Sequence, residues 1–543
     1  MSKVNKEWWR GAVLYQIYPR SFADTNADGI GDLPGITSHL DHLANLGVDA
    51  VWISPFFKSP MKDFGYDVSD YCDVDPVFGS LDDFIHLLDE AHKRDIKVVI
   101  DQVWSHTSEE HVWFKKSRSD RTNEKADWYV WADPKPDGTP PNNWLSYFGG
   151  PAWTFDTRRQ QYYLHHFLKE QPALNLRNPE VLDRIKKTGA FWLDMGVDGF
   201  RLDVAHTYYY DPELRDNPVR PDSQPWATDL PPNNPMGYQK RIHSMNNDDN
   251  LKLIEELRSF INEWPDKFLL AEAGGDDSET VAAEYTQTGK RFHMAYSFGL
   301  VGTEMTKPDI IRAVSKIENV IQDGWVCWAT GNHDFKRVVS RLNDQIGYED
   351  RARFAMALGL TLRGNLCIYQ GEELGLPQAE LRFEDLVDPY DIAMYPDHAG
   401  RDGCRTPMPW THNIPNAGFS TNYKTWLPLA EAHVPLSVDV QEKDDHSILN
   451  AYKNMIAWRK GNDVIKHGHF RLLETAGNII AYERYHDDET VFCVFNAGVS
   501  EEYFELDSKK SYNFNQDISH KAQFKGNSLL LEPFGYGILN VSN

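Results

Sequence analysis

Four carboxylates end short apolar runs in the first 375 residues of this chain, and their placement is the clearest sign of chemistry. They are Asp101, Asp203, Glu272 and Asp334. A single carboxylate at such a place would be an ordinary solvated loop residue. Four at corresponding places indicate a site in which carboxylates from different runs face one another.

Facing carboxylates without histidine-rich metal ligands suit glycoside hydrolysis. One carboxylate attacks or stabilises the anomeric carbon, and the other, kept protonated, donates to the leaving oxygen. Arg201 lies two residues before Asp203, on the same face of a strand, and is expected to hold Asp203 ionised. Glu272 follows three apolar residues, a flank that favours the protonated form of a general acid.

A second group of oxygen side chains lies between residues 24 and 32. Asp24, Asn26, Asp28 and Asp32 are interleaved with glycines over nine residues, as in a calcium-binding loop. The twelve-residue EF-hand is excluded because its terminal Glu is missing. The alternative interpretation is an Asx-rich turn that binds no metal.

Regular elements must bring the four carboxylates to one edge. Helical patterns separate the apolar runs: Leu81–Lys93 has apolar residues at i, i+3, i+4 and i+7, and Asn178-Pro179 opens a second helix, Glu180–Leu193. Eight runs with helices between them predict an α/β fold, the (β/α)8 TIM barrel, whose chemistry lies at the carboxyl ends of the strands. The predicted strands are Val13–Pro19, Ala50–Pro55, Lys97–Val103, Gly199–Val204, Phe268–Gly274, Phe292–Phe298, Val326–Asp334 and Asn365–Glu372.

The spacing of these runs predicts the domain organisation. Asp101 and Asp203 are 102 residues apart, far more than the other neighbours, so an inserted loop domain follows the third strand. Alternating runs such as Thr490–Phe495 predict a small C-terminal antiparallel β-sandwich. The predicted boundaries are 1–104 for the first part of the barrel, 105–175 for the inserted domain, 176–462 for the second part with an irregular insertion at 376–435, and 463–543 for the C-terminal β domain.

Composition excludes several classes of partner. The 543 residues contain 81 acidic and 56 basic side chains, a net charge of −25, which opposes nucleic acids and anionic membranes. No stretch of 18 apolar residues occurs and the N-terminus has no signal-like apolar region, so we expect a soluble, cytoplasmic protein. The five cysteines have neither disulfide-framework nor zinc spacing and are expected to be free thiols.

Taken together, these motifs resemble the α-amylase superfamily, glycoside hydrolase family 13, in its α-glucosidase and oligo-1,6-glucosidase branch. The resemblance covers essentially the whole chain. The four signature regions are matched in order by Asp101 to His106, Gly199 to Asp203, Glu272, and Asn332 to Asp334.

Two further segments carry the resemblance. Gly65-Tyr-Asp67-Val-Ser-Asp70-Tyr is similar to the segment whose Asp binds the nonreducing-end glucose, and Gly400 to Trp410 resembles the motif after the eighth strand, in which an arginine lines the sugar site. Two positions depart from the pattern. Ser105 stands where the family usually has Asn, and Gln171-Pro-Ala173-Leu-Asn lacks the branch's acidic residue, so we assign that segment no role.

The resemblance implies a role for each matched residue. Asp203 would be the nucleophile, Glu272 the acid/base, and Asp334 the third carboxylate, which binds ring hydroxyls. The residues implied to line the sugar site are Asp67, His106, Phe148, Phe167, Arg201, His333 and Arg401. The acidic loop would hold one structural Ca²⁺, or Mg²⁺, through Asp24, Asn26, Asp28, the Ile30 carbonyl and Asp32. No organic cofactor is implied.

The implied function is a retaining exo-α-glucosidase that releases glucose from the nonreducing end of short α-glucosides, with transglucosylation. Its partner would be a small oligosaccharide, and the chain would be a monomer or homodimer. Val204, directly after the nucleophile, resembles the α-1,6-active members, which favours isomaltose over maltose, although the loop Tyr208–Ile242 could override it. The alternatives are a predominantly glucosyl-transferring or sucrose-acting relative and, more remotely, a catalytically inactive structural barrel.

Overall fold

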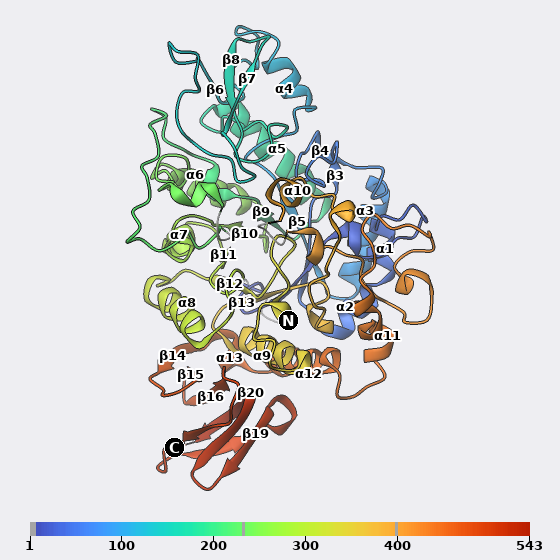
Figure 1. The fold of residues 1–543 in the computed structure, drawn as a ribbon, viewed down its shortest axis with the longest axis vertical. Helices are drawn as coiled ribbons and strands as arrows, with labels where there is room; N and C mark the ends of the chain where they lie inside the picture. The colour runs from blue at the N-terminus through green and yellow to red at the C-terminus, as the bar shows by residue number, and fades with distance from the viewer. Residues whose placement is uncertain (1–6, 231–233, 397–399, 543) are drawn as a thin grey trace.

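The computed structural model describes residues 7–230, 234–396 and 400–542, and its centre is a closed parallel barrel (Figure 1). The strand order is β1-β13-β12-β11-β10-β9-β5-β2, so β1 and β13 close the sheet. This confirms the predicted (β/α)8 barrel. Its strands are β1 (Val13–Ile17), β2 (Ala50–Ile53), β5 (Lys97–Gln102), β9 (Gly199–Leu202), β10 (Phe268–Glu272), β11 (Met294–Tyr296), β12 (Val326–Ala329) and β13 (Asn365–Tyr369).

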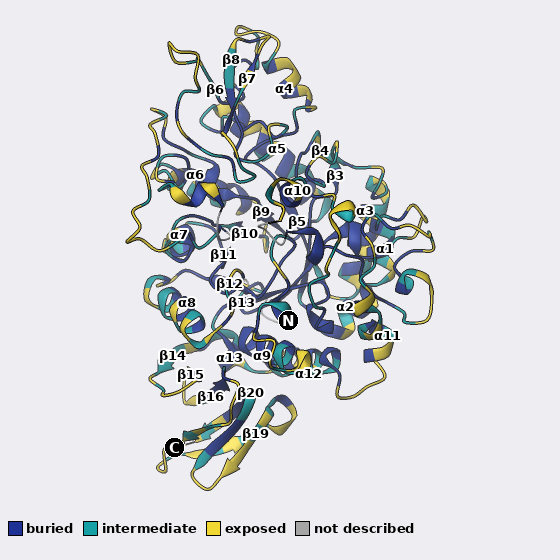
Figure 2. Ribbon diagram, in the orientation of Figure 1, coloured by how far each residue is buried: buried dark blue, intermediate teal, exposed yellow. Residues whose placement is uncertain are grey.

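Helices surround the barrel, and the barrel strands are buried along their length (Figure 2). Helix α3 spans the predicted residues Leu81–Lys93, because Ser80 and Asp83 form a reciprocal capping box at its start. The other helices are α1 (Leu33–Ser38), α2 (Leu40–Leu46), α4 (Val112–Ser117), α5 (Pro179–Met195), α6 (Asn250–Ile261), α7 (Ser278–Thr286), α8 (Lys307–Val320), α9 (Tyr348–Thr361), α10 (Pro389–Met394), α11 (Val438–Gln441), α12 (Ile448–Lys460) and α13 (Asp463–His467).

Two smaller β structures lie between β2 and β9. Strands β3 (Phe57–Lys58) and β4 (Asp70–Val74) form an antiparallel pair after β2. Within residues 105–175, a three-stranded sheet has the order β6-β8-β7. Figure 1 places this sheet at the opposite end of the molecule from the C-terminal domain. Its strands are β6 (Trp131–Ala132), β7 (Trp153–Asp156) and β8 (Gln161–Leu164).

The C-terminal residues form the predicted antiparallel β domain. Its long last strand, β20 (Ser528–Ser542), pairs with β17 and β19 through its first residues and with β16 and β18 through its last. One strand therefore connects the two parts of the domain. The remaining strands are β14 (His469–Leu473), β15 (Ile479–His486), β16 (Glu489–Asn496), β17 (Glu502–Glu505), β18 (Ser511–Phe514) and β19 (His520–Lys525).

This β domain shares a continuous hydrophobic core with the barrel. The Phe354 ring on α9 packs against Phe495 and Phe534 at centroid distances of 5.6 and 5.0 Å. The buried Arg484 guanidinium on β15 donates to the Thr361 carbonyl at the end of α9, at 2.7 Å. Tyr482 and Thr361 join their hydroxyls at 2.6 Å. Aromatic packing and buried hydrogen bonds thus tie the two domains together.

Two expectations about covalent and membrane features can be compared with the structure. All five cysteines are free thiols, and four of them, Cys327, Cys367, Cys404 and Cys493, are buried. Within the described ranges, no helix has the length and apolar character that crossing a bilayer requires.

Candidate active site

A cavity of about 770 Å³ opens at the carboxyl ends of the barrel strands. Its walls come from the barrel, from residues 147–171 of the inserted domain and from a covering segment, Pro225–Leu230. Asp203, Glu272 and Asp334 all line it. The structure therefore brings three of the four strand-end carboxylates into one cavity, at the place where barrel chemistry is expected.

A single guanidinium joins the carboxylates on one side of this cavity. Arg201 Nη1 donates to Asp101 Oδ1 at 2.9 Å and to Asp203 Oδ1 at 2.6 Å, and its Nη2 donates to Glu272 Oε2 at 2.5 Å. Parallel pairing produces this arrangement, because Asp101 on β5 is in register with Arg201 on β9. The guanidinium carbon also lies 4.8 Å from the Trp52 ring centroid. Arg201 is thus fixed between its partners.

Three carboxylates around one cation carry excess negative charge, so the cluster favours binding a proton. Burial raises the pKa of Asp203 well above its usual range; Arg201 opposes this, and the Glu272 and Asp101 carboxylates add to it. Burial likewise raises the pKa of Asp101 to about 6, against the effect of Arg201. Arg201 thus favours the ionised form of Asp203, as expected, whereas burial and the neighbouring carboxylates oppose it.

Glu272 is also held by a backbone donor. The amide of Val204 donates to Glu272 Oε2 at 3.0 Å. Val204 adopts a left-handed backbone with φ of 38°, which is unusual for a β-branched residue. This amide and Arg201 both bind Oε2, so the two donors fix the orientation of the Glu272 carboxyl group.

Asp334 occupies a different electrostatic setting. Arg401 Nη1 and Arg405 Nη2 donate to its Oδ1 at 3.1 and 2.9 Å. Although burial alone would raise the pKa of Asp334, His333 and the two arginines hold it well below its usual range. Burial lowers the pKa of His333 to about 3. A neutral imidazole therefore lies beside a permanently ionised carboxylate, a combination suited to binding sugar hydroxyls.

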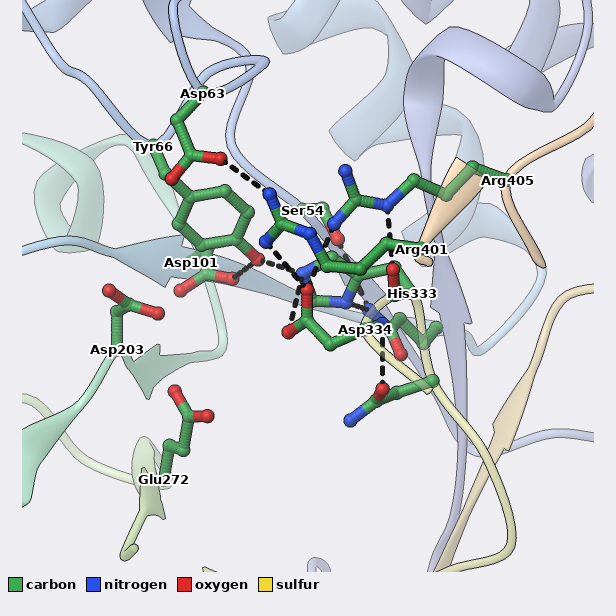
Figure 3. A network of polar contacts seen from close by, with 12 residues as sticks. Ser54, Asp63, Tyr66, Asp101, Asp203, Glu272, His333, Asp334, Arg401 and Arg405 are labelled. Atoms are coloured by element: carbon green, nitrogen blue, oxygen red, sulfur yellow. Dashed lines mark hydrogen bonds and ion pairs between the residues drawn. The ribbon is translucent and has the colours of Figure 1, made fainter. Parts of the chain in front are cut away.

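Arg401 and Asp63, which both line the cavity, form an ion pair (Figure 3). Arg401 Nη2 donates to Asp63 Oδ1 at 3.0 Å, and its Nε donates to Asp388 Oδ2 at 2.6 Å. Burial raises the pKa of Asp63 to about 6, with Arg401 opposing. Gln171 Nε2 donates to Asp63 Oδ2 at 3.0 Å. The arginine thus links the segment after β13 to the segment between β2 and β4.

Asp67 does not line the cavity, which corrects the sequence interpretation. Its side chain is fully buried and accepts hydrogen bonds from Ser59 Oγ, the Lys62 amide and the Asp63 amide, at 2.8, 3.0 and 3.0 Å. Asp67 therefore shapes the loop, whereas Asp63, four residues earlier, faces the cavity. The physical reason is that an irregular loop has no fixed periodicity that could indicate which of two nearby carboxylates points inward.

Of the other residues implied by the resemblance, Arg201 is buried behind its carboxylate partners and does not line the cavity. The cavity wall does include His106, Phe148, Phe167, His333 and Arg401. His106 binds the Tyr66 carbonyl through Nε2 at 3.0 Å, and burial lowers its pKa to about 4. The Phe148 and Phe167 rings pack edge-on at 5.7 Å, and the Arg401 guanidinium lies 4.8 Å from the Phe148 centroid. These rings provide an apolar wall beside the polar groups.

Sequence reasoning missed several cavity residues. Gln171 belongs to the segment that we assigned no role, yet it contacts both Asp63 and His106. Its position within a branch-like motif was the available signal. Tyr66 donates to Asp101 and contacts His333. The signal that could have indicated it was its place within the segment Gly65-Tyr-Asp67. Other unanticipated wall residues include Tyr147, His206, Asp229 and Tyr390, which no local pattern distinguishes.

The acidic loop after β1 fits a hard cation by its donor chemistry. Asp24, Asn26 and Asp28 each accept backbone amides in tight Asx turns, for example Asp28 Oδ1 from the Ile30 amide at 2.8 Å. Asp32 instead caps α1, accepting the Gly35 amide at 2.7 Å. Among the described residues, no three His, Cys, Asp or Glu side chains already converge as a ligand group. The loop is an all-oxygen donor set whose carboxylates are organised mainly by the backbone.

Known sequences are similar to this chain over most of its length. A family model described as the alpha amylase catalytic domain matches residues 16–468. A probable alpha-glucosidase of Rhizobium meliloti (strain 1021) is 51% identical over 497 residues, which cover 91% of this chain and 90% of that protein. An oligo-1,6-glucosidase of Heyndrickxia coagulans is 37% identical over 528 residues, covering 90% and 92%.

Solved structures are similar over nearly the whole length. The crystal structure of an alpha-glucosyl transfer enzyme matches with a TM-score of 0.95 and 48% identity, covering 98% of this chain and 99% of that one. A trehalulose synthase from Pseudomonas mesoacidophila MX-45 matches with a TM-score of 0.89 and 31% identity, covering 98% and 99%. The fold of this chain is therefore shared over nearly its whole length with these two solved enzymes.

Proposed function

Because this chain belongs to the alpha-amylase family and is a glycoside hydrolase, we propose that it is a retaining exo-α-glucosidase that acts on short α-glucosides and also transfers glucose. The observation that carries this proposal is the arrangement of Asp203 and Glu272 on the two terminal nitrogens of one guanidinium. Two carboxylates bound to one Arg201 are near neighbours. A close pair favours a covalent, retaining reaction over one that admits a water between the carboxylates.

In the first step, an ionised Asp203 attacks the anomeric carbon of the bound glucosyl residue. The bond to the glycosidic oxygen breaks, and Glu272 gives its proton to that oxygen, so a glucosyl ester and a free alcohol result. The cluster's shared proton must therefore lie on Glu272, not Asp203, when the sugar is bound. Arg201 stabilises the charge that moves from Asp203 to Glu272 during this step.

In the second step, the Glu272 carboxylate removes a proton from an incoming hydroxyl. The oxygen of that hydroxyl attacks the anomeric carbon and Asp203 leaves, which restores both carboxyl groups. Water as the incoming molecule gives hydrolysis with net retention, and a sugar or another alcohol gives transfer. The similarity to an alpha-glucosyl transfer enzyme supports including transfer.

Exo action is supported by the closed side of the cavity. We propose that the Arg401–Asp63 ion pair and Gln171, which line the cavity, block the space beyond the nonreducing-end sugar. Asp334, with its pKa well below the usual range, is placed to accept hydrogen bonds from ring hydroxyls. A chain end enters such a pocket, whereas an internal glucan segment does not.

A second candidate function is predominantly glucosyl transfer. The covering segment places Pro225, Trp226, Ala227 and Leu230 in the cavity wall, and we propose that this apolar surface faces the leaving group. Such a surface disfavours water as the incoming molecule relative to an organic alcohol. Quantifying transfer products against free glucose at high substrate concentration distinguishes the two candidates.

We extend the proposal to the bound metal ion, the cellular compartment and the oligomeric state. We propose that the acidic loop binds one structural Ca²⁺ or Mg²⁺ through Asp24, Asn26, Asp28, the Ile30 carbonyl and Asp32, supported by the donor chemistry of the loop. We also propose a cytoplasmic location, supported by the five free thiols. A monomer and a homodimer are both compatible with this function.

The proposed function is tested by product analysis with maltose, isomaltose, nigerose, sucrose and starch. We expect glucose from the short substrates, initially as the α-anomer by NMR, and little from starch. An initial β-anomer would overturn the retaining mechanism. Absence of glucose or transfer products from every substrate would overturn the α-glucosidase assignment.

A further inference from the structure

Four segments that are distant in sequence meet directly behind the acid/base residue. His206 follows β9, Gly274 and Gly275 follow β10, Asp229 belongs to the covering segment, and Tyr147 belongs to the inserted domain. His206 is 2% exposed and the side chain of Asp229 is 4% exposed. None of these groups has a step assigned to it in the reaction described above.

Two of these side chains bind the backbone that follows Glu272. The Gly274 amide donates to His206 Nδ1 at 3.0 Å, and the Gly275 amide donates to Asp229 Oδ2 at 2.8 Å. These are the second and third peptide units after the acid/base residue. Since β10 ends at Glu272, both units lie beyond the strand.

The remaining contacts indicate which atoms of His206 and Tyr147 act as donors and which as acceptors. His206 Nδ1 lies 3.0 Å from the Gly274 amide and 3.4 Å from the Glu272 carbonyl oxygen, so we assign the shorter contact as the hydrogen bond and Nδ1 as its acceptor. Nε2 then carries the hydrogen and donates to the Tyr147 hydroxyl, at 3.0 Å. Tyr147 in turn donates to Asp229 Oδ2 at 3.2 Å. Burial lowers the pKa of His206, in keeping with this neutral form. Each donor therefore has an acceptor with one consistent direction.

A buried cation completes the network. Arg241 Nη2 donates to Asp229 Oδ1 at 2.5 Å, and Nη1 donates to the Tyr147 hydroxyl at 3.1 Å. Its side chain is 1% exposed. A buried ion pair with several hydrogen bonds is rigid, and removing one partner leaves an uncompensated charge. Asp229 is therefore held in place by Arg241, which follows the covering segment in the sequence.

The packing around Gly274 leaves no room for adjustment. A β-carbon added at this glycine would lie 2.7 Å from Asp229 Oδ2 and 2.9 Å from His206 Cε1. Both side chains thus press against the same backbone that they bind. Moving either one would shift the peptide units on which the direction of the Glu272 side chain depends.

We propose that His206 and Asp229 are positioning residues that fix the Gly274–Gly275 backbone and thereby aim Glu272 at the glycosidic oxygen. This inference rests on the proposed function, since it assigns these residues to the acid step of that reaction. Arg201 and the Val204 amide hold the carboxyl end of Glu272, and His206 and Asp229 hold the backbone from which it extends.

The test compares leaving groups that need protonation with one that does not. For wild type, His206→Leu and His206→Asn, kcat/KM is measured on 2,4-dinitrophenyl α-glucoside and on maltose or isomaltose, whichever wild type cleaves faster. Asn retains an oxygen that can accept the Gly274 amide, whereas Leu does not. This constant reports the first chemical step, in which Glu272 acts as acid.

We expect His206→Leu to lower kcat/KM for the disaccharide by about 10- to 100-fold and for the aryl glucoside by less than about threefold. His206→Asn should stay within about threefold of wild type on both substrates. Asp229→Leu removes the acceptor of Gly275 and should show the same selective loss. Because Asp229→Leu also leaves the buried Arg241 charge without its partner, His206→Ala, which removes only the imidazole acceptor, keeps the test available if His206→Leu does not fold.

The matched control is His433→Leu. His433 is also fully buried and neutral, but it contacts the Pro377 carbonyl outside the cavity wall, so any loss should be equal on both substrates. Equal losses for His206→Leu and Asp229→Leu, or no loss, would overturn the inference alone. A wild type inactive on both substrates would overturn the proposed function and the inference together.

Discussion

At the scale of single residues, the carboxylates crowded around Arg201 are needed for activity, but burying their charges lowers the stability of the fold. Asp203→Asn removes the nucleophile and should lower kcat on an α-glucoside by at least about a thousandfold. Because burial already disfavours the Asp203 charge, the melting temperature should hold or rise. Calorimetry and initial rates on the same preparation test this pair of outcomes.

The control for Asp203→Asn is Asp183→Asn, a change at a carboxylate that is 63% exposed and distant from the cavity. It should alter neither the rate nor the melting temperature. If Asp203→Asn lowered both quantities together, Asp203 would be a structural residue and the nucleophile would have to be sought elsewhere.

Linkage preference is also a residue-scale question. Val204 lines the cavity beside Glu272 and cannot hydrogen-bond an incoming sugar through its side chain. Val204→Thr adds a hydroxyl and should shift the maltose-to-isomaltose ratio of kcat/KM toward maltose by about tenfold. Val204→Ala, which adds no hydroxyl, serves as the control. An unchanged ratio in the Thr variant would show that this position carries no linkage information.

The residue types at the site were predictable where strands position them and unpredictable where loops do. Asp203, Glu272 and Asp334 come after apolar runs, and strand ends in a barrel converge on one rim. Asp63 and Asp67 both lie in an irregular loop, so sequence alone could not decide which faces inward. The contact between His206 and Gly274 depends on two neighbouring strands ending in register, which no local pattern encodes.

At the scale of elements, the acidic loop between β1 and α1 should respond to chelation. If the loop binds Ca²⁺, excess chelator should lower the melting temperature by several degrees while changing the initial rate little, because the loop lies outside the cavity wall. Differential scanning calorimetry with and without chelator measures the shift.

Asp28→Ala provides the matched variant for chelation. Asp28 is exposed, and its described contact is to the Ile30 amide within the loop, so the fold should survive its loss. The variant should melt at the same temperature with and without chelator. A chelator shift of equal size in Asp28→Ala and wild type would place the metal somewhere other than this loop.

Helices and strands were predicted well where a single sequence signal, such as an apolar run or a helix cap, determines them. The eight apolar runs contain the eight barrel strands, and α3 has the predicted bounds because its cap and its periodicity agree. The predicted strands extend past the observed ends, for example to Asp334 instead of Ala329, because loop residues at the rim continue the extended pattern. The covering segment Pro225–Leu230 has no regular structure, so its place over the cavity could not be read from periodicity.

At the scale of the whole molecule, the barrel and the C-terminal β domain should unfold as one unit. Phe354→Ala removes a ring shared by Phe495 and Phe534 and should destabilise the protein by about 3–5 kcal/mol. Calorimetry should still give one transition at a lower temperature. Two separated transitions in wild type would contradict the shared core, and Phe383→Ala, at a half-exposed ring, serves as the control.

A buried carboxyl behind the cavity makes global stability depend on pH. Burial raises the pKa of Glu372 to about 7, whereas in an unfolded chain it titrates near 4.5. The neutral form is favoured in the fold, so its contribution is complete below the unfolded pKa and is lost as the pH rises through about 7. Glu372→Gln mimics the neutral form and should gain stability relative to wild type between pH 5 and about pH 8, by a few kcal/mol at most.

Denaturant titrations of wild type and Glu372→Gln across this pH range test the effect. The exposed Glu384→Gln is the control and should track wild type at each pH. A constant difference between wild type and Glu372→Gln would mean that Glu372 does not change its protonation between the folded and unfolded chains in this range.

The missing space at Gly274 also constrains the order in which this protein can change over evolutionary time. Any side chain there collides with Asp229 and His206, so a substitution at position 274 is harmful in the present background. The same substitution becomes tolerable only after both neighbours, at positions 206 and 229, leave room for a β-carbon. We therefore expect residues other than glycine at position 274 only in relatives that have changed both of these neighbours.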